Sequence, residues 1–485
     1  MFQTRKNVLM ITTDHWSANL MGCAGHPVVM TPTIDQLAND GIRFTNCFST
    51  CPVCIPARRS LMTGTFPKTH GDRVYSDRMP MPDIPTLAQT FGDAGYQTFA
   101  VGKLHVYPQR SRIGFDDVIL QEEGRYEFGN VDDYQIWLGE QGYAGEEFMH
   151  SMGNNSYLTR PWHLPENAHP TTWGTRQMMK QIKRKDPTRP AFYYMSYQFP
   201  HPPLVPLQTF LDMYEDSEID MPVDCENWVD DREIIKLLQE QAIPYTKKDI
   251  LRAKKAFYAQ CTHIDFQIRN LIGTLRECNL LKDTIIVFTS DHGDTLFEHG
   301  MVGKRTFYQG SANVPLIFSG EAMSKWRGMI SDRLVCLEDI MPTLLDLCGV
   351  EIPPTVQGIS AFSENKRDLL YCEIGEGVKA TRMATDGTYK LIYYPYGNVF
   401  QLFNCKTDLN DNIDLYGNSE YDSIVEKLKD YLKSQLHGSD MSWLADGEFV
   451  GMETKPFEKA ADYGLFNQRG LHWPPPSGYS NLGKT

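Results

Sequence analysis

The amino-acid sequence predicts an α/β fold, in which a mostly parallel β-sheet has helices on both faces, followed by a smaller α+β unit. Through the first three-quarters of the chain, short apolar runs alternate with stretches of helical periodicity. Strands that are apolar along most of their length are typical of parallel sheets buried between two layers of helices. Beyond residues 352–354 (Ile-Pro-Pro) the pattern changes to extended segments around tight turns, which indicates a separate antiparallel sheet.

The larger unit has strands and helices that can be placed from periodicity. Apolar runs predict strands at Val8–Thr12, Thr98–Val101, Phe192–Ser196, Ile285–Thr289 and Leu316–Phe318. Helical spacing of apolar residues predicts helices at Pro85–Ala94, Lys248–Arg276 and Leu337–Leu347.

The smaller unit combines a few strands with one helix. Arg382–Tyr394 is expected to form two extended segments around a turn at Asp386 and Gly387, and Val399–Phe403 a further strand. Tyr421–Leu436 has the spacing of an amphipathic helix.

These patterns divide the chain into a main domain, a small domain and a tail. We expect the main domain over residues 1–365, with an insertion near the binding site over 121–190, and the small α+β domain over 366–440. The tail over 441–485 contains Trp473 followed by three prolines. Such a tail is too aromatic for a solvated terminus, so we expect it to pack on the body or on a neighbouring subunit of a homo-oligomer.

The composition argues against several classes of partner. The formal net charge is −14 at pH 7, which disfavours general binding of nucleic acid or of an anionic membrane surface. No segment approaches the roughly 20 apolar residues that span a bilayer. The apolar run before Asp14 is too short for a signal peptide, so we expect a cytoplasmic protein. An anionic substrate would therefore need a local basic site.

Acidic and imidazole side chains follow two of the expected strands. Asp14 and His15 follow the first strand, and Asp291 and His292 follow the strand at 285–289. In open α/β sheets, ligands bind outside the carboxyl ends of the strands. Two carboxylates and two imidazoles brought together there can hold a divalent cation. The alternative is that each pair only caps a turn at a strand end.

Cationic side chains and further histidines occupy similar places. Arg58, Lys103 and Lys304 are candidate anion binders, and the two lysines each follow a glycine. His105 and His201 are candidates for proton transfer, because histidine titrates near neutral pH. Solvated lysines and half-buried histidines without a catalytic part are the alternative.

The segment around Cys54 carries the most specific signal. Cys54 precedes Pro56 and Arg58 where a turn passes into a short helix, and N–H groups at a helix N-terminus favour an anion. The chain has 11 cysteines, an odd number without the spacing of a disulfide framework. Cys51 and Cys54 form a C-x-x-C pair, which could also be half a zinc site or a redox pair. No second pair at matching spacing follows, and Pro56 lies outside the pair.

Taken in order, these motifs resemble the type I sulfatases of the alkaline phosphatase superfamily, near the choline sulfatase and phosphonate monoester hydrolase branches. The signature is Cys54-x-Pro56-x-Arg58 with Leu61, Thr63 and Gly64. The other matching segments are Gly102-Lys103-x-His105, Pro200-His201-x-Pro203, Ser290-Asp291-His292-Gly293 and Lys304. The resemblance covers nearly the whole chain, and it implies an alkaline-phosphatase-like sheet with a smaller C-terminal domain.

The resemblance also implies a covalent mechanism. The cysteine that matches Cys54 is oxidised to formylglycine by a maturation enzyme, and the hydrated aldehyde attacks sulfur and later expels sulfate. By the same resemblance, Arg58 holds the formylglycine and Lys103 and Lys304 bind the sulfate oxygens. His201 would protonate the leaving oxygen, and His105 would deprotonate the second hydroxyl.

The metal site and one substrate contact depart from the usual pattern. The resemblance implies that a divalent metal is held by Asp14, His15, Asp291, His292 and the group derived from Cys54. Calcium is the usual ion of the family, whereas imidazole ligands shift the preference toward manganese, zinc or iron. An asparagine that related branches carry beyond the signature is absent from residues 69–77, and Arg73 or Tyr75 could take its place.

These observations predict hydrolysis of a small anionic sulfate monoester. The alternative is a phosphonate monoester or phosphodiester hydrolase, because those substrates carry the same single negative charge. A binding protein that keeps the fold without catalysis is a third possibility, but no expected catalytic position is missing. Trp137, Trp162 and Trp173 could form a pocket wall that stacks on a ring of the substrate.

Overall fold

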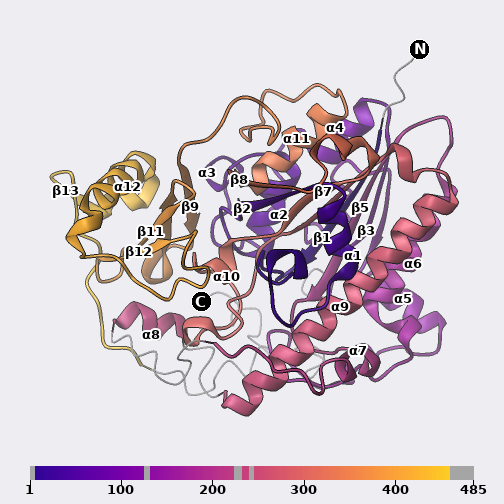
Figure 1. Ribbon diagram of the computed structural model, residues 1–485, viewed down its shortest axis with the longest axis horizontal. Coiled ribbons are helices and arrows are strands. Elements are labelled where there is room, and N and C mark those ends of the chain that lie inside the picture. The colour runs from indigo at the N-terminus through magenta and orange to yellow at the C-terminus, as the bar shows by residue number, and fades with distance from the viewer. Residues whose placement is uncertain (1–5, 125–130, 223–231, 240–244, 459–485) are drawn as a thin grey trace.

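The computed structural model describes residues 6–124, 131–222, 232–239 and 245–458. Its centre is an eight-stranded sheet in the spatial order β4-β3-β5-β1-β6-β7-β2-β8 (Figure 1). In chain order the strands are β1 (Asn7–Asp14), β2 (Ile42–Phe48), β3 (Gln97–Gly102), β4 (Asp117–Leu120), β5 (Ala191–Pro200), β6 (Thr284–Ser290), β7 (Leu316–Ser319) and β8 (Met329–Cys336). The expected mostly parallel sheet is thereby confirmed.

One strand runs against the others. β7 pairs antiparallel with both β6 and β2, whereas every other neighbouring pair in this sheet is parallel. The apolar run at Leu316–Phe318 identified the strand but not its direction, because a buried strand has the same composition in either direction. β2, β4 and β8 were not predicted, since β4 is short and the other two mix polar with apolar residues.

Helices cover both faces of the sheet. Along β1, Leu9 and Ile11 belong to one core cluster, and Val8 and Met10 to another on the opposite face. The first face is covered by α1 (Pro32–Asn39), α6 (Pro170–Arg184) and α9 (Lys247–Glu277), and the second by α2 (Cys54–Thr63), α4 (Leu87–Asp93) and α11 (Ile340–Leu347) (Figure 1). This arrangement leaves the ends of the strands as the open edge where a ligand can bind.

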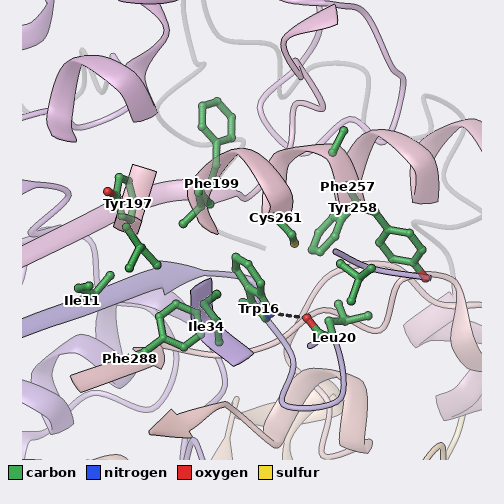
Figure 2. Packing of buried hydrophobic residues seen from close by; sticks show 14 of the residues in the cluster. Ile11, Trp16, Leu20, Ile34, Tyr197, Phe199, Phe257, Tyr258, Cys261 and Phe288 are labelled. Carbon is green, nitrogen blue, oxygen red and sulfur yellow. Dashed lines mark hydrogen bonds between the residues drawn. The ribbon is translucent and has the colours of Figure 1, made fainter. Parts of the chain in front are cut away.

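The long helix α9 fixes the strand end that carries His15. The helix begins at a capping box, in which the Thr246 side chain accepts from the backbone N–H of Asp249 and the Asp249 carboxylate accepts from that of Thr246. Figure 2 shows the Trp16 ring between Phe288 of β6 and this helix, with the indole N–H donating to the carbonyl of Leu20 at 2.9 Å. The turn after β1 is therefore held rigidly from the core side.

A second sheet lies beside the first. It has the antiparallel order β12-β11-β10-β9, from β9 (Leu370–Ile374), β10 (Thr381–Thr385), β11 (Tyr389–Tyr394) and β12 (Val399–Asn404). α12 (Asp422–Gln435) packs on one face, and the other face packs against residues that follow β2 and β6. The hairpin at Asp386 and Gly387, the strand at 399–403 and the helix near 421–436 agree with the sequence prediction.

The remaining helices are short or peripheral. They are α3 (Pro67–His70), α5 (Asp133–Glu140), α7 (Gln208–Asp212), α8 (Glu233–Gln239) and α10 (Gln309–Ala312). Within the described ranges, no helix is both long and apolar enough to cross a membrane. Residues 125–130 of the expected insertion and 459–485 of the expected tail, including Trp473, lie outside the described residues.

Candidate active site

Four neighbouring strand ends supply the polar side chains of the site. β1 ends at Asp14, Lys103 follows β3, His201 follows β5, and Asp291 follows β6. These strands adjoin one another in the order β3-β5-β1-β6, so their carboxyl ends meet at one edge. All four side chains are buried. The sheet therefore brings together charged groups that lie far apart in the chain.

Cys54 enters this cluster from the helix layer. It is the first residue of α2, and the residue before it, Val53, is extended. Its Sγ lies 3.2 Å from His292 Nε2 and 3.7 Å from Asp14 Oδ1. Burial and Asp14 raise the pKa of the thiol, but Lys304, Lys103 and His292 outweigh them and leave it below its usual value. The thiol therefore lies among the charged and imidazole side chains of the strand ends.

Arg58 lies one helical turn beyond Cys54 and joins three strand ends. Its Nε donates to Asp291 Oδ2 at 2.8 Å, and its Nη1 donates to the carbonyl of Lys103 at 2.7 Å and to Ser196 Oγ at 2.8 Å. Burial opposes its charge, but the Asp291 carboxylate raises the pKa of Arg58. The guanidinium consequently fixes α2 against the sheet edge.

Lys103 is held by two carboxylates. Gly102 precedes it with a φ of 102°, and a Cβ there would lie 1.9 Å from the carbonyl oxygen of Ser196. Lys103 Nζ is 2.5 Å from both Asp14 Oδ2 and Glu123 Oε1. Glu123 was not predicted as a site residue, because the short strand β4 that precedes it was not predicted.

Lys304 lies between the two imidazoles of His15 and His201. Its Nζ donates to His15 Nε2 at 2.6 Å and to His201 Nε2 at 3.0 Å. His201 Nδ1 donates in turn to the carbonyl of Pro202 at 2.5 Å. Burial and the nearby Lys304 lower the pKa of His15 to about 3, and the same two causes hold the pKa of His201 well below its usual range. Both rings are therefore neutral here, with Nδ1 protonated.

Asp294 supports this group and was not predicted. Its Oδ2 accepts from His15 Nδ1 at 2.6 Å and from the Tyr157 hydroxyl, and its Oδ1 accepts from the backbone N–H groups of Leu296 and Gly303 at 2.8 and 3.0 Å. Burial opposes ionisation, but the contact with His15 holds the pKa of Asp294 below its usual value. Its place three residues after Asp291 was the only local signal for it.

Asp14, Cys54, Asp291 and His292 form a candidate metal site. One donor atom from each lies within 4.8 Å of the others, and all four residues are buried. Asp14 Oδ1 is 3.4 Å from His292 Nε2, a spacing that suits donors sharing one ion at roughly 2.0–2.4 Å. A second such group contains Asp14, His15 and His201. His15 thus adjoins the metal donors while its Nε2 is paired with Lys304.

The carboxylates and the imidazole of this cluster change one another's pKa values. Burial raises the pKa of Asp14, but Lys103, His201 and His292 outweigh it and hold the value well below the usual range. Burial and the neighbouring Asp14 raise the pKa of Asp291. Burial lowers the pKa of His292, yet Asp291, Cys54 and Asp14 raise it to about 9. Such concentrated negative charge around one point is what a bound cation would stabilise.

His105 is buried two residues after Lys103 and contacts one of the two residues proposed to replace the missing asparagine. Its Nε2 is 3.1 Å from the hydroxyl of Tyr75. Arg73, in contrast, forms ion pairs with Glu373 and Asp440 at 2.8 and 2.9 Å. Tyr75 is thus the one that reaches the site, whereas the Arg73 guanidinium is directed toward the C-terminal region.

A small cleft opens beside His201 and Glu123. Its other lining residues include Glu147, His150 and Trp162, from the chain segment between α5 and α6. Of the three tryptophans considered above, Trp162 lines this cleft, whereas Trp137 and Trp173 pack with Tyr134 in a separate cluster. Cys51, the partner of Cys54 in the C-x-x-C pair, is a free buried thiol whose Sγ is 3.7 Å from the carbonyl oxygen of Arg73.

Comparison with known proteins identifies the family of this chain. The family model described as sulfatase matches residues 6–350, which is more than half of the chain. The chain belongs to the sulfatase family. It is a type I sulfatase of the alkaline phosphatase superfamily and a sulfuric ester hydrolase. A second model, described as the C-terminal part of N-sulphoglucosamine sulphohydrolase, matches residues 297–437.

Two curated sulfatases and one solved structure show how far the similarity extends. An arylsulfatase of Clostridium perfringens is 32% identical over 90% of this chain and 95% of its own length. A choline-sulfatase of Rhizobium meliloti is 29% identical over 83% of this chain and 81% of its own. The crystal structure of a phosphonate monoester hydrolase of Agrobacterium radiobacter superposes with a TM-score of 0.75, covering 92% of this chain and all of that one at 21% identity. That structure shows the shared fold.

Proposed function

We propose that this sulfatase hydrolyses a small sulfate monoester to an alcohol and inorganic sulfate, using formylglycine made from Cys54 and one divalent metal ion. One observation carries the proposal. Cys54, at the start of α2, lies within 3.7 Å of both His292 and Asp14, in the same site as the buried Lys103 and the half-buried Lys304. A matured Cys54 would thus lie within the electrostatic influence of both lysines.

The two groups that the chain must acquire supply distinct chemistry. Formylglycine supplies a hydrated aldehyde whose oxygen can act as the nucleophile in place of the Cys54 sulfur. The metal supplies Lewis-acid polarisation of an ester oxygen and lowers the pKa of a bound hydroxyl. Asp14, Asp291 and His292 are the proposed protein ligands, with His15 beside them. Calcium, manganese and zinc remain candidates, and the imidazoles favour the last two.

Binding of the anionic ester is assigned to the two lysines. Lys103 contacts Asp14 and Lys304 contacts the neighbouring His15, and the two charges would compensate a sulfate in a site otherwise crowded with carboxylates. Arg58 orients Cys54 and Asp291 from within the helix layer.

Proton transfer is assigned to the histidines. His201 Nε2 accepts from Lys304 and lines the cleft beside the site, so this pair can deliver a proton to a leaving alcohol that occupies the cleft. The negative charge of a bound ester would raise the pKa of His201 from its low value, because it offsets the repulsion from Lys304. His105 is the proposed base for regeneration of the nucleophile.

Mass spectrometry of the peptide that contains Cys54 tests the proposed nucleophile directly. We expect the active protein, produced with a formylglycine-generating enzyme, to carry an aldehyde at Cys54, and Cys54→Ala to be inactive. An active enzyme with an unmodified thiol would refute the proposed mechanism.

The second candidate is hydrolysis of phosphonate monoesters or phosphodiesters at the same site. It is favoured by the shared fold of the phosphonate monoester hydrolase and by the single negative charge common to these esters. Comparison of kcat/KM for an aryl sulfate and an aryl phosphonate distinguishes the two. Faster turnover of the phosphonate would reverse the order of the two proposals.

A further inference from the structure

Two arginines from distant parts of the chain converge on one buried carboxylate. Arg382 of β10 donates to Asp440 through Nε and Nη2 at 2.8 and 2.9 Å. Arg73 donates to the same carboxylate through Nη1 and Nη2 at 2.9 and 3.0 Å, and also to Glu373 at 2.8 Å. Bidentate pairs of this kind fix orientation as well as charge. Arg73 is therefore anchored on the C-terminal sheet.

The turn that follows Arg73 is tied down at several points. The backbone N–H of Gly375, just after β9, donates to the carbonyl of Arg73 at 2.7 Å. The Asp72 carboxylate accepts from the backbone N–H groups of Val74 and Tyr75 at 3.1 and 3.0 Å. The turn over residues 72–76 is thus fixed by its own aspartate on one side and by the C-terminal region on the other.

This turn places Tyr75 on His105. Tyr75 has a φ of 84°, a conformation that non-glycine residues rarely adopt and that persists where the surroundings enforce it. Its hydroxyl is 3.1 Å from His105 Nε2. The backbone of His105 is fixed separately, because its N–H and that of Leu104 donate to Glu122 Oε1 at 2.9 and 2.7 Å. The Tyr75 contact therefore acts on the imidazole ring.

We propose that Tyr75 is a positioning residue for His105 and that the C-terminal region controls it through Asp440 and Arg73. This inference rests on the proposed function, in which His105 is the base that regenerates the nucleophile. Loss of the Tyr75 hydroxyl removes one hydrogen bond that orients the ring, and loss of the Asp440 charge loosens the turn that carries Tyr75. Both changes slow the chemical step and leave binding of the ester to Lys103 and Lys304 intact.

Steady-state kinetics of Tyr75→Phe, Asp440→Asn and the double variant test this chain of contacts from Asp440 through Arg73 and Tyr75 to His105, which we call the relay. We expect kcat to fall about 10-fold in each single variant, part of what a general base contributes, while KM for an aryl sulfate stays within about twofold. Because both substitutions act on one pathway, the double variant is expected to match Tyr75→Phe alone. Wild-type kcat in Tyr75→Phe, or full additivity in the double variant, would overturn the proposal.

Two controls are needed. One shows whether a loss of kcat comes from general destabilisation, and the other tests the proposed role of His105 apart from the relay. Asp411→Asn breaks a buried pair with Lys390 (2.6 Å) in the same C-terminal region, away from the turn, and is expected to keep kcat per folded molecule. If it loses kcat as Asp440→Asn does, the relay is wrong. His105→Asn tests the base itself: an active variant refutes the role of His105, whereas an inactive one beside an unaffected Tyr75→Phe refutes only the relay.

A milder substitution replaces Asp440→Asn if that variant does not fold. Glu376 is exposed and lies 3.2 Å from Arg73 Nε, so Glu376→Gln loosens Arg73 without leaving a buried charge unpaired. We expect a few-fold loss of kcat that disappears in the Tyr75→Phe background. A loss of the same size in both backgrounds would overturn the proposal.

Discussion

Replacement of Asp294 by asparagine should disable the site without altering any group that touches the substrate. In the wild type, Oδ2 of Asp294 accepts from His15 Nδ1–H and from Tyr157, and Oδ1 accepts from two backbone N–H groups, one of them that of Gly303 beside Lys304. The asparagine side chain of the Asp294→Asn variant would keep its oxygen for the backbone and turn its NH₂ group toward His15. Two donors would then face each other.

The ring of His15 can escape this conflict by moving its proton to Nε2. That tautomer can no longer accept from Lys304 or bind a metal through Nε2. The loss of one charge-assisted hydrogen bond costs about 1.5–3 kcal/mol. If the whole cost falls on the transition state, kcat/KM decreases by roughly 10- to 150-fold.

The assay is kcat/KM for an aryl sulfate, together with ¹⁵N spectra of the histidines to identify the tautomer of His15. Tyr157→Phe is the matched control, because it removes the other partner of the same carboxylate oxygen and leaves the contact to His15 in place. We expect it to retain most of the activity. An Asp294→Asn enzyme that is folded and within twofold of wild-type kcat/KM would refute the reasoning.

Three further predictions concern the metal, the cleft and the sheet edge. Removal of bound metal with a chelator should abolish activity and lower the melting temperature, since an ion at 100 times its Kd stabilises by about 2.7 kcal/mol; unchanged activity in protein that elemental analysis finds metal-free would contradict the metal site. Trp162→Ala should raise KM for a bulky sulfate ester several-fold while Trp137→Ala, outside the cleft, does not; equal KM values would exclude Trp162 from substrate binding. Gly102→Ala should destabilise by more than about 2 kcal/mol in urea titrations, because its Cβ would collide with Ser196; a wild-type midpoint would show that the strand ends can separate freely.

Most of the fold could be predicted from local sequence patterns, namely apolar runs and helical spacing. Five of the eight strands that build the main sheet were expected as parallel strands, and four of them, β1, β3, β5 and β6, are parallel, with bounds close to those observed except at the end of β5. The helix α9 was expected within one residue at each end. Apolar runs and helical spacing are properties of neighbouring residues, so they can be read without knowing the partners. The direction of β7 and the existence of β2, β4 and β8 could not be read in this way.

The residues of the candidate site likewise include some that the sequence identified and some that it did not. The rule that ligands bind at the carboxyl ends of strands pointed to Asp14, Lys103 and Asp291, and the structure brings these side chains together. This rule did not identify Glu123, which contacts Lys103, or Asp294, which contacts the His15 ring. The contact between His15 and Asp294 joins residues 279 positions apart, and no periodicity encodes such a pair.

The sequence by itself therefore determined the family, the class of reaction and the residue, Cys54, on which the chemistry is proposed to depend. These follow from short motifs whose spacing is set within a single strand end or helix turn. Only the tertiary structure decided which carboxylate meets which cation or imidazole: Glu123 at Lys103, Asp294 at the His15 ring, and Asp440 at Arg73. The reason is physical, because a charge buried away from water needs a partner at about 3 Å. The fold selects that partner from the whole chain.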